Sequence, residues 1–116
     1  MVASGSFRPQ ERIRHRIEFQ RVYEHGARIR TQYCTLFVLP NKQAAGRLGI
    51  AATKKLGGSV QRNRAKRLVR EVFRHNKIAP GYDVVVVPRR ELLGASLVAL
   101  EADYRNALAR RIQQRP

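Results

Sequence analysis

The segment SVQRNRAKRLVREVFR, residues 59–74, decides how this chain folds and what it can bind. Apolar side chains recur along it at helical spacing: Ala65, Leu68, Val69, Val72 and Phe73. Basic side chains occupy much of the remaining surface: Arg62, Arg64, Lys66, Arg67, Arg70 and Arg74. This pattern predicts an amphipathic helix with one face on a hydrophobic core and another face that can bind a polyanion.

The rest of the chain is basic as well. It has 24 Lys and Arg against 8 Asp and Glu in 116 residues, a formal net charge of +16. Nineteen of the cations are Arg, whose planar guanidinium suits bidentate phosphate contacts and stacking on bases. These features favour nucleic acid as the partner. A solvated surface and an anionic membrane surface are alternatives, but neither explains why the basic helix also carries a core face.

Length and cysteine content narrow the class of protein. A chain of 116 residues has the usual size of one domain. Cys34 is the only cysteine, so neither an intrachain disulfide nor a multi-cysteine zinc site can form, and its apolar neighbours predict a buried thiol. The sequence has no apolar run long enough to cross a membrane and no hydrophobic signal core near its start. We therefore expect a reduced, cytoplasmic protein.

The first half of the chain predicts an arm, a helix and two strands. Residues 1–14 are polar without a hydrophobic period, which indicates a basic arm, either flexible or loosely docked, before a single domain over residues 15–116. A short helix is predicted over 15–25, a strand with two largely apolar faces over 32–39, and a second strand over 47–53. The short polar loop between the strands is typical of a hairpin, so we expect antiparallel pairing.

The second half alternates helix and strand. Ser59 is a candidate N-cap for the basic helix, which Pro80 and Gly81 terminate. Residues 83–89, DVVVVPR, are typical of a central strand buried on both faces. A last helix is predicted over 92–113, and one further short strand could lie near 27–30. This order predicts an α+β fold, a two-layer sandwich of three helices against a small mixed sheet of about four strands.

The side chains show no arrangement typical of catalysis. The three histidines, His15, His25 and His75, and the eight carboxylates are scattered without acid–base or metal-ligand spacing. No phosphate-binding loop, metalloprotease motif or nucleophile elbow occurs. We predict no catalytic residue and no metal site in the polypeptide itself.

Four aromatic residues form a second candidate surface. Phe19 and Tyr23 share a face of the first helix, and Tyr33 and Phe37 share a face of the first strand. If the junction between them is open, it can stack unpaired bases, each worth roughly 1 to 3 kcal/mol. If it is closed, it is core. The sequence favours the core for Phe19 and Phe37 and leaves the two tyrosines undecided.

Two longer stretches resemble a known family. Residues 47–73, RLGIAATKKLGGSVQRNRAKRLVREVF, resemble the signature of the protein subunit of bacterial ribonuclease P: a strand, a Lys-Lys pair, a Gly-containing turn and an RNR-x-KR-x-x-R helix. Residues 18–39, EFQRVYEHGARIRTQYCTLFVL, are similar to the family's first helix and following strand. The resemblance covers about residues 12–90. It implies a ribosomal protein S5 domain 2-like fold whose βαβ crossover is left-handed, against the usual rule.

The resemblance also implies a function. The family's ribonucleoprotein hydrolyses one phosphodiester bond to remove the 5′ leader from precursor tRNA. Its RNA is the catalyst and binds Mg²⁺, while the protein is an accessory subunit. The implied partners are ribonuclease P RNA and precursor tRNA, with no membrane and no DNA. A ribosome-associated or general RNA-binding module is the alternative, and a DNA-binding protein comes third.

The family's functional residues carry over to matching positions. The motif that binds the catalytic RNA corresponds to Lys54, Lys55, Arg62, Asn63, Arg64, Lys66, Arg67 and Arg70. The cleft that binds the single-stranded leader corresponds to Phe19, Tyr23 and Tyr33, and strand alternation adds Phe37. Exposure of the two tyrosines would distinguish a leader-binding protein from a ribosome-type protein, which needs no open aromatic cleft.

Overall fold

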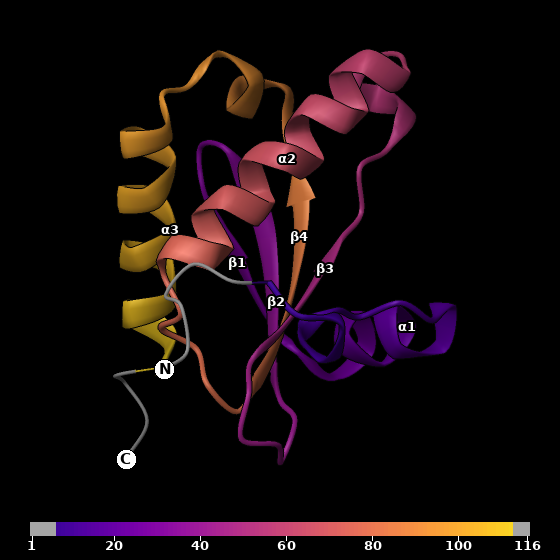
Figure 1. The fold of residues 1–116 in the computed structure, drawn as a ribbon, viewed down its shortest axis with the longest axis vertical. Helices are drawn as coiled ribbons and strands as arrows, with labels where there is room; N and C mark the ends of the chain where they lie inside the picture. The colour runs from indigo at the N-terminus through magenta and orange to yellow at the C-terminus, as the bar shows by residue number, and fades with distance from the viewer. Residues whose placement is uncertain (1–6, 113–116) are drawn as a thin grey trace.

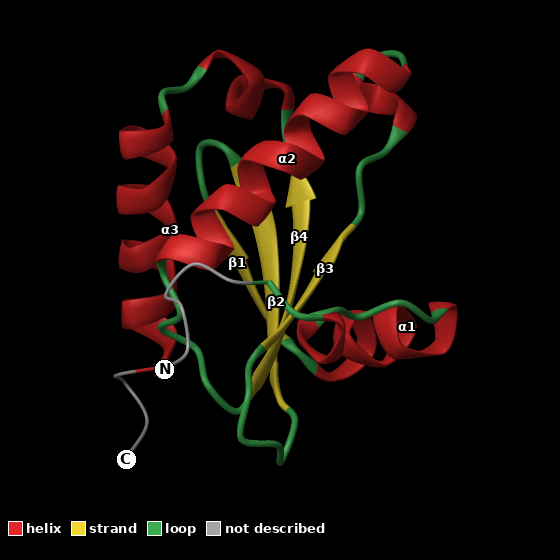
Figure 2. Cartoon of the chain, viewed as in Figure 1, coloured by secondary structure: helices red, strands yellow, loops and turns green. Residues whose placement is uncertain are grey.

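A computed structural model describes residues 7–112, so residues 1–6 of the expected arm lie outside it. Three helices and four strands make up the domain (Figures 1 and 2). In chain order they are α1 (Arg16–His25), β1 (Ala27–Arg30), β2 (Cys34–Pro40), β3 (Arg47–Ile50), α2 (Ser59–His75), β4 (Tyr82–Pro88) and α3 (Leu97–Ile112). Single 3₁₀ turns occur at Pro9–Glu11, Lys54–Leu56 and Arg90–Gly94. The predicted α+β class is confirmed.

The strands form one mixed sheet in the order β1-β2-β4-β3. β2 is antiparallel to both β1 and β4, and β3 is parallel to β4. The predicted hairpin between residues 32–39 and 47–53 is therefore wrong, because β4 lies between β2 and β3. Val84, Val85 and Val86 are all buried, and a strand that is apolar on both faces belongs inside the sheet.

The connection from β3 through α2 to β4 is left-handed. Both strands run upward in Figure 1, α2 crosses in front of the sheet, and β4 lies to the left of β3. A right-handed crossover would place β4 on the opposite side. This is the handedness that the family resemblance implied.

Helices cover the two faces of the sheet unequally. α2 and α3 share the main core with one face, where Leu36, Val84 and Val86 lie among buried side chains of both helices. On the opposite face, Val22 of α1 packs on Val85 in a smaller cluster. This second cluster also includes Ile13, Phe19, Phe37, Leu39 and Val87. α1 is a single short helix, so it covers only part of this face (Figure 1).

Of the two alternatives predicted for the arm, residues 7–14 adopt the docked one. The Ile13 amide donates a hydrogen bond to the Leu48 carbonyl (2.9 Å), and the Ile13 side chain is buried. Phe7 packs edge-on against Phe73 of α2, with ring centroids 5.5 Å apart. Glu11 is buried and pairs with Lys77 (2.7 Å). We call this docked stretch, residues 7–14, the N-terminal segment.

Helix ends account for two further differences. Gly58, not Ser59, is the N-cap of α2, and Ser59 is its first residue. The helix predicted over 92–113 is interrupted, because the 3₁₀ turn Arg90–Gly94 precedes α3. The Ser96 hydroxyl accepts a hydrogen bond from the Ala99 amide (3.1 Å), which is how an N-cap serine starts a new helix.

Candidate RNA-binding surfaces

The basic face of α2 forms one wall of a groove. This groove has a volume of about 620 Å³, and the N-terminal segment forms its other wall. It is lined by Phe7, Arg12, Asn63, Lys66, Arg67, Arg70, Glu71 and Arg74. The helix presents these polar side chains because Ala65, Val69, Val72 and Phe73 hold its opposite face in the core. Four of the predicted RNA-binding residues therefore lie side by side in the α2 groove.

The charges in the α2 groove are largely unpaired. Glu71 is its one carboxylate, and it forms an ion pair with Arg74. Among residues 7–112, no carboxylate lies within ion-pair distance of Arg67 or Arg70. Unpaired guanidinium groups beside one another favour a bound polyanion over an empty groove.

The other predicted cations lie elsewhere. Arg62 donates a hydrogen bond to the Gly57 carbonyl (3.2 Å), which holds the turn before α2. Arg64 is exposed on α2 and Lys54 is exposed in the preceding 3₁₀ turn, both outside the groove. Lys55 lines a second hollow of about 470 Å³ at the far end of the sheet.

This second hollow, the sheet-end groove, was not predicted from the sequence. Its cationic side chains come from β1, the turn before α2 and the end of β4: Arg28, Arg30, Lys55, Arg89 and Arg90. Arg28 lies opposite Phe37 in the β1–β2 ladder, and Arg30 lies opposite Thr35. Residues directly opposite in a ladder project to the same face. The sheet-end groove therefore continues the face on which α1 packs.

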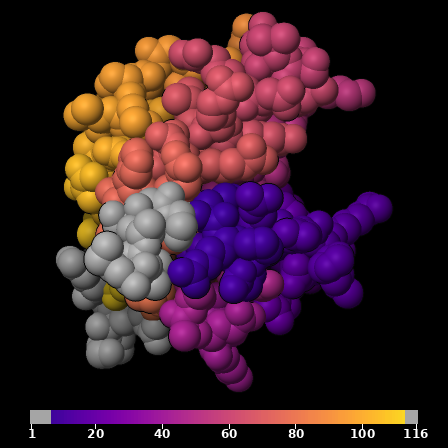
Figure 3. All heavy atoms as spheres, viewed as in Figure 1, coloured from indigo at the N-terminus to yellow at the C-terminus, as the bar shows by residue number. Residues whose placement is uncertain are grey.

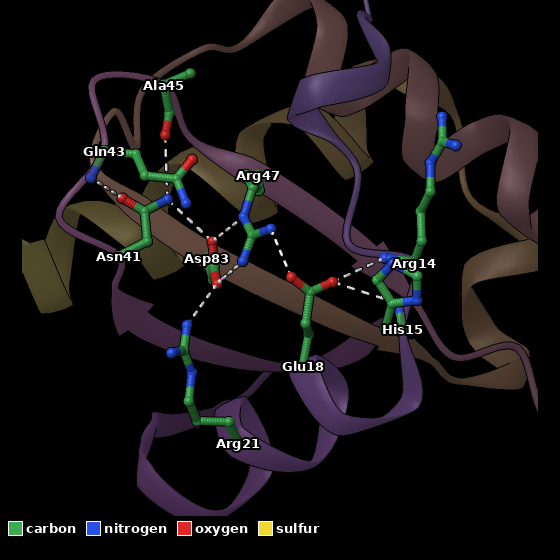
Figure 4. Close-up of polar contacts among 9 residues, drawn as sticks. All are labelled: Arg14, His15, Glu18, Arg21, Asn41, Gln43, Ala45, Arg47 and Asp83. Atoms are coloured by element: carbon green, nitrogen blue, oxygen red, sulfur yellow. Dashed lines mark hydrogen bonds and ion pairs between the residues drawn. The ribbon is translucent and has the colours of Figure 1, made fainter.

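A buried ion-pair network fixes α1 on the sheet (Figure 4). Arg47 of β3 binds Asp83 of β4 through two parallel hydrogen bonds of 2.8 and 2.7 Å. Its remaining terminal nitrogen reaches Glu18 of α1 (2.9 Å). Asn41 also donates to Asp83 (2.9 Å), and Arg21 approaches the same carboxylate at 3.7 Å. The network thus joins two strands and one helix.

The network also stabilises its charges. Hydrogen bonding to Asp83 raises the pKa of Arg47, although burial opposes this. Burial acts to raise the pKa of Glu18, but hydrogen bonds from Arg47 and from the His15 amide outweigh it, so that pKa lies below its ordinary value. Glu18 therefore stays ionised and also holds the amide groups that begin α1.

α1 presents two aromatic rings, Phe19 and Tyr23, which lie beside Phe37 of β2. Tyr23 lies edge-on to Phe37 with ring centroids 5.0 Å apart, and Phe19 lies 6.4 Å from Tyr23. Tyr23 is 39% exposed, whereas Phe19 and Phe37 are half-buried. A Cβ on Gly49 would lie 2.8 Å from the Phe19 ring, so this position has room only for glycine. We call Phe19, Tyr23 and Phe37 the aromatic cluster.

Tyr33 does not belong to this cluster. It precedes β2 in a turn where its amide and that of Cys34 both donate to the Thr31 hydroxyl. Tyr33 then packs against the main core beside α3, on the opposite side of the sheet from Phe37. The alternation of side chains along a strand predicted that Tyr33 shares a face with Phe37. That prediction is wrong because β2 begins only at Cys34.

Sequence reasoning also missed Phe7 and Arg12 in the α2 groove. The Arg12 guanidinium lies over the Phe7 ring, 4.7 Å from its centroid. Pro9 and Ile13 were the sequence signals that this segment is ordered. A proline can begin a short helical turn, and an isolated apolar residue can anchor a segment on a core.

Metal-ligand groups and buried ionisable side chains are the remaining candidates for a reactive site. Residues 7–112 contain no group of three or more His, Cys, Asp or Glu placed to share a metal ion. Burial raises the pKa of Cys34 to about 11 and also raises that of Tyr104. The helices of the described part are too short or too polar to cross a membrane.

Comparison with known proteins identifies the family. The family model described as Ribonuclease P matches residues 7–112. The chain belongs to the ribonuclease P protein family. The ribonuclease P protein component of Clostridium kluyveri is 38% identical over 101 residues, which are 84% of this chain and 90% of that one. That of Clostridioides difficile is 35% identical over 96 residues, 80% and 84% of the two chains.

Solved structures agree with this assignment. The ribonuclease P protein of Thermotoga maritima superposes with a TM-score of 0.78 at 34% identity, over 86% of this chain and 96% of that one. The Staphylococcus aureus ribonuclease P protein gives 0.77 at 29% identity, over 88% and 95%. Family membership gives the chain a role in ribonuclease P, the tRNA-processing endoribonuclease.

Proposed function

We propose that this protein is the accessory subunit of a cytoplasmic ribonucleoprotein that removes the 5′ leader from precursor tRNA. We assign hydrolysis of the phosphodiester bond to ribonuclease P RNA, where bound Mg²⁺ supplies water activation and charge stabilisation. The polypeptide binds and positions the two RNAs. The observation that carries the proposal is that one domain holds two different RNA-compatible surfaces, the cationic α2 groove and the aromatic cluster, in which Tyr23 is exposed.

The α2 groove is the surface for the catalytic RNA. Its side chains Lys66, Arg67 and Arg70 project from a rigid helix, so the backbone loses little conformational entropy when phosphates bind. Exposed Arg64 on the same helix can extend the contact. Each neutralised phosphate releases condensed counterions, so about four contacts would make log K fall with log salt at a slope of roughly −3 to −4. This contact fixes the position of the protein on the RNA without reading sequence.

The aromatic cluster is the surface for the leader. Tyr23 is 39% exposed and its ring makes a T-shaped contact with Phe37, so an unpaired base can stack on the exposed part of the aromatic cluster. One such stack is worth roughly 1 to 3 kcal/mol, or about 5- to 150-fold in affinity. Because Arg28 lies directly opposite Phe37, the leader's phosphates would continue from the cluster into the sheet-end groove.

This division explains how the protein assists an RNA catalyst. Precursor tRNA carries the leader, whereas the mature product does not. Contacts with the leader therefore strengthen substrate binding without strengthening product binding. Of the two tyrosines whose exposure would distinguish a leader-binding protein from a ribosome-type protein, Tyr23 is exposed and supports the leader-binding role, whereas Tyr33 is half-buried.

Reconstitution tests the proposal. Ribonuclease P RNA at limiting Mg²⁺ should cleave leader-bearing precursor tRNA more efficiently with the protein than without it, and the protein alone should leave the precursor intact. Equally tight binding to ribonuclease P RNA and to unrelated structured RNAs, with no gain in cleavage, would favour the general RNA-binding alternative.

A further inference from the structure

The N-terminal segment supplies two of the eight residues that line the α2 groove. Phe7 and Arg12 face Asn63, Lys66 and Arg70 across it. Figure 3 shows the segment, in indigo, directly beneath α2 on the same face of the molecule. The same two residues also line an adjoining hollow of about 210 Å³, which reaches Phe19 of α1.

The segment is held in place before any ligand binds. It is anchored by the Ile13–Leu48 hydrogen bond, the Phe7–Phe73 ring contact and the ion pair of Glu11 with Lys77. Lys77 also lies 5.8 Å from the Phe73 ring centroid. Hydrogen bonds from the Arg8 amide and Lys77 hold the pKa of Glu11 below its ordinary value, although burial acts to raise it, so the ion pair persists near neutral pH. The wall is thus preorganised.

Arg12 is a cation without a carboxylate partner in this arrangement. Among residues 7–112 the Arg12 guanidinium contacts the Phe7 ring, 4.7 Å from its centroid, and the residue is exposed. A guanidinium stacked on an aromatic face keeps its hydrogen-bond donors free at the edge of its plane. These donors lie in a groove that contains five cationic side chains and one carboxylate, which Arg74 already pairs.

We propose that Arg12, positioned by Phe7, is a further RNA-contacting residue, and that the α2 groove clamps one strand of sugar–phosphate backbone between the N-terminal segment and α2. The inference rests on the proposed function, because it assigns the strand to the catalytic RNA. A groove volume of about 620 Å³ is in the range of sites that bind one small ligand, so the groove can hold a short stretch of one sugar–phosphate backbone. Phosphates would bind the guanidinium edges of Arg12, Arg67 and Arg70.

Binding titrations with ribonuclease P RNA at several salt concentrations test this. Arg12→Ala should weaken binding about tenfold and reduce the magnitude of the salt slope by about 1, as expected for one lost phosphate contact. Phe7→Leu keeps an apolar contact with Phe73 but removes the ring beneath Arg12. It should therefore lower the affinity for ribonuclease P RNA about threefold, with little change in the salt slope. Arg16→Ala is the matched control, because Arg16 is exposed and lines neither hollow. Melting curves should show that all variants fold.

The outcomes separate this inference from the function on which it rests. If wild-type protein binds ribonuclease P RNA tightly but Arg12→Ala matches Arg16→Ala in affinity and slope, the clamp is refuted and the function stands. If wild-type protein shows no preference for ribonuclease P RNA, the proposed function itself fails. If Arg12→Ala weakens only binding of leader-bearing precursor to the holoenzyme, the strand in the groove is the leader, which overturns the assignment to the catalytic RNA.

Discussion

Replacing Arg47 with methionine should be among the most damaging single changes to this protein. Asp83 is fully buried, and Arg47 supplies two of its hydrogen bonds, at 2.8 and 2.7 Å. Methionine fills much of the same volume but donates nothing. The carboxylate would keep the Asn41 bond and the more distant Arg21, so it would remain buried and incompletely paired.

The size of the effect follows from this geometry. Removing one partner of a buried ion pair typically costs 3 to 5 kcal/mol, and the remaining Asn41 bond places Arg47→Met near about 3 kcal/mol. In a domain of this size, about 4 °C is lost per kcal/mol, so the melting temperature should fall by roughly 12 °C. Arg21→Met is the matched control. That side chain is 55% exposed and lies 3.7 Å from Asp83, so its loss should cost at most about 0.5 kcal/mol.

Urea unfolding of the three proteins at neutral pH measures the difference. Arg47→Met should also loosen α1, because Glu18 loses its link to the sheet. In the double variant Arg47→Met/Asp83→Leu most of the lost stability should return, since no buried charge remains. If Arg47→Met and Arg21→Met lose similar amounts, or if the double variant is no more stable than Arg47→Met, the network does not fasten α1 as described.

Three further outcomes are expected. Gly49→Ala should lower the free energy of unfolding by about 1 to 3 kcal/mol, because its Cβ would lie 2.8 Å from the Phe19 ring; unchanged urea curves would contradict this packing. The carboxylates of Glu11 and Glu18 have lowered pKa values in the folded protein, so their stabilisation is present above the ordinary value of 4.5 and is lost as pH falls through the folded values. The free energy of unfolding should therefore fall less steeply on acidification for Glu11→Gln than for wild type. Identical pH profiles would disprove the ion-pair role. At a net charge of +16, sulfate should raise the melting temperature more than chloride of equal ionic strength, and an equal response would exclude specific anion binding.

Local patterns predicted the elements well. The apolar stripe of residues 59–74 and the valine run of β4 depend only on neighbouring side chains, which is why α2 and the central strand were found near their true bounds. The cations Lys66, Arg67 and Arg70 were correctly grouped for the same reason. A regular helix fixes which side chains share a face.

Features that depend on the whole chain were missed. The β2–β3 hairpin is wrong because a strand that follows later in the sequence takes the place between them. Tyr33 was misplaced by a turn that depends on the Thr31 hydroxyl. Residues 7–14 showed no periodicity, yet Phe7 and Ile13 each find a partner distant in the sequence. Such contacts follow from topology rather than from local pattern.

The most direct test of the central claim is the affinity of the reconstituted complex for precursor tRNA with and without its leader. For wild type, we predict tighter binding of the leader-bearing form. Tyr23→Ala should reduce that affinity advantage by about 5- to 150-fold while leaving affinity for ribonuclease P RNA unchanged. Tyr33→Ala should behave as wild type. A leader advantage that survives Tyr23→Ala, or an equal loss of affinity for both RNAs, would contradict two separate surfaces.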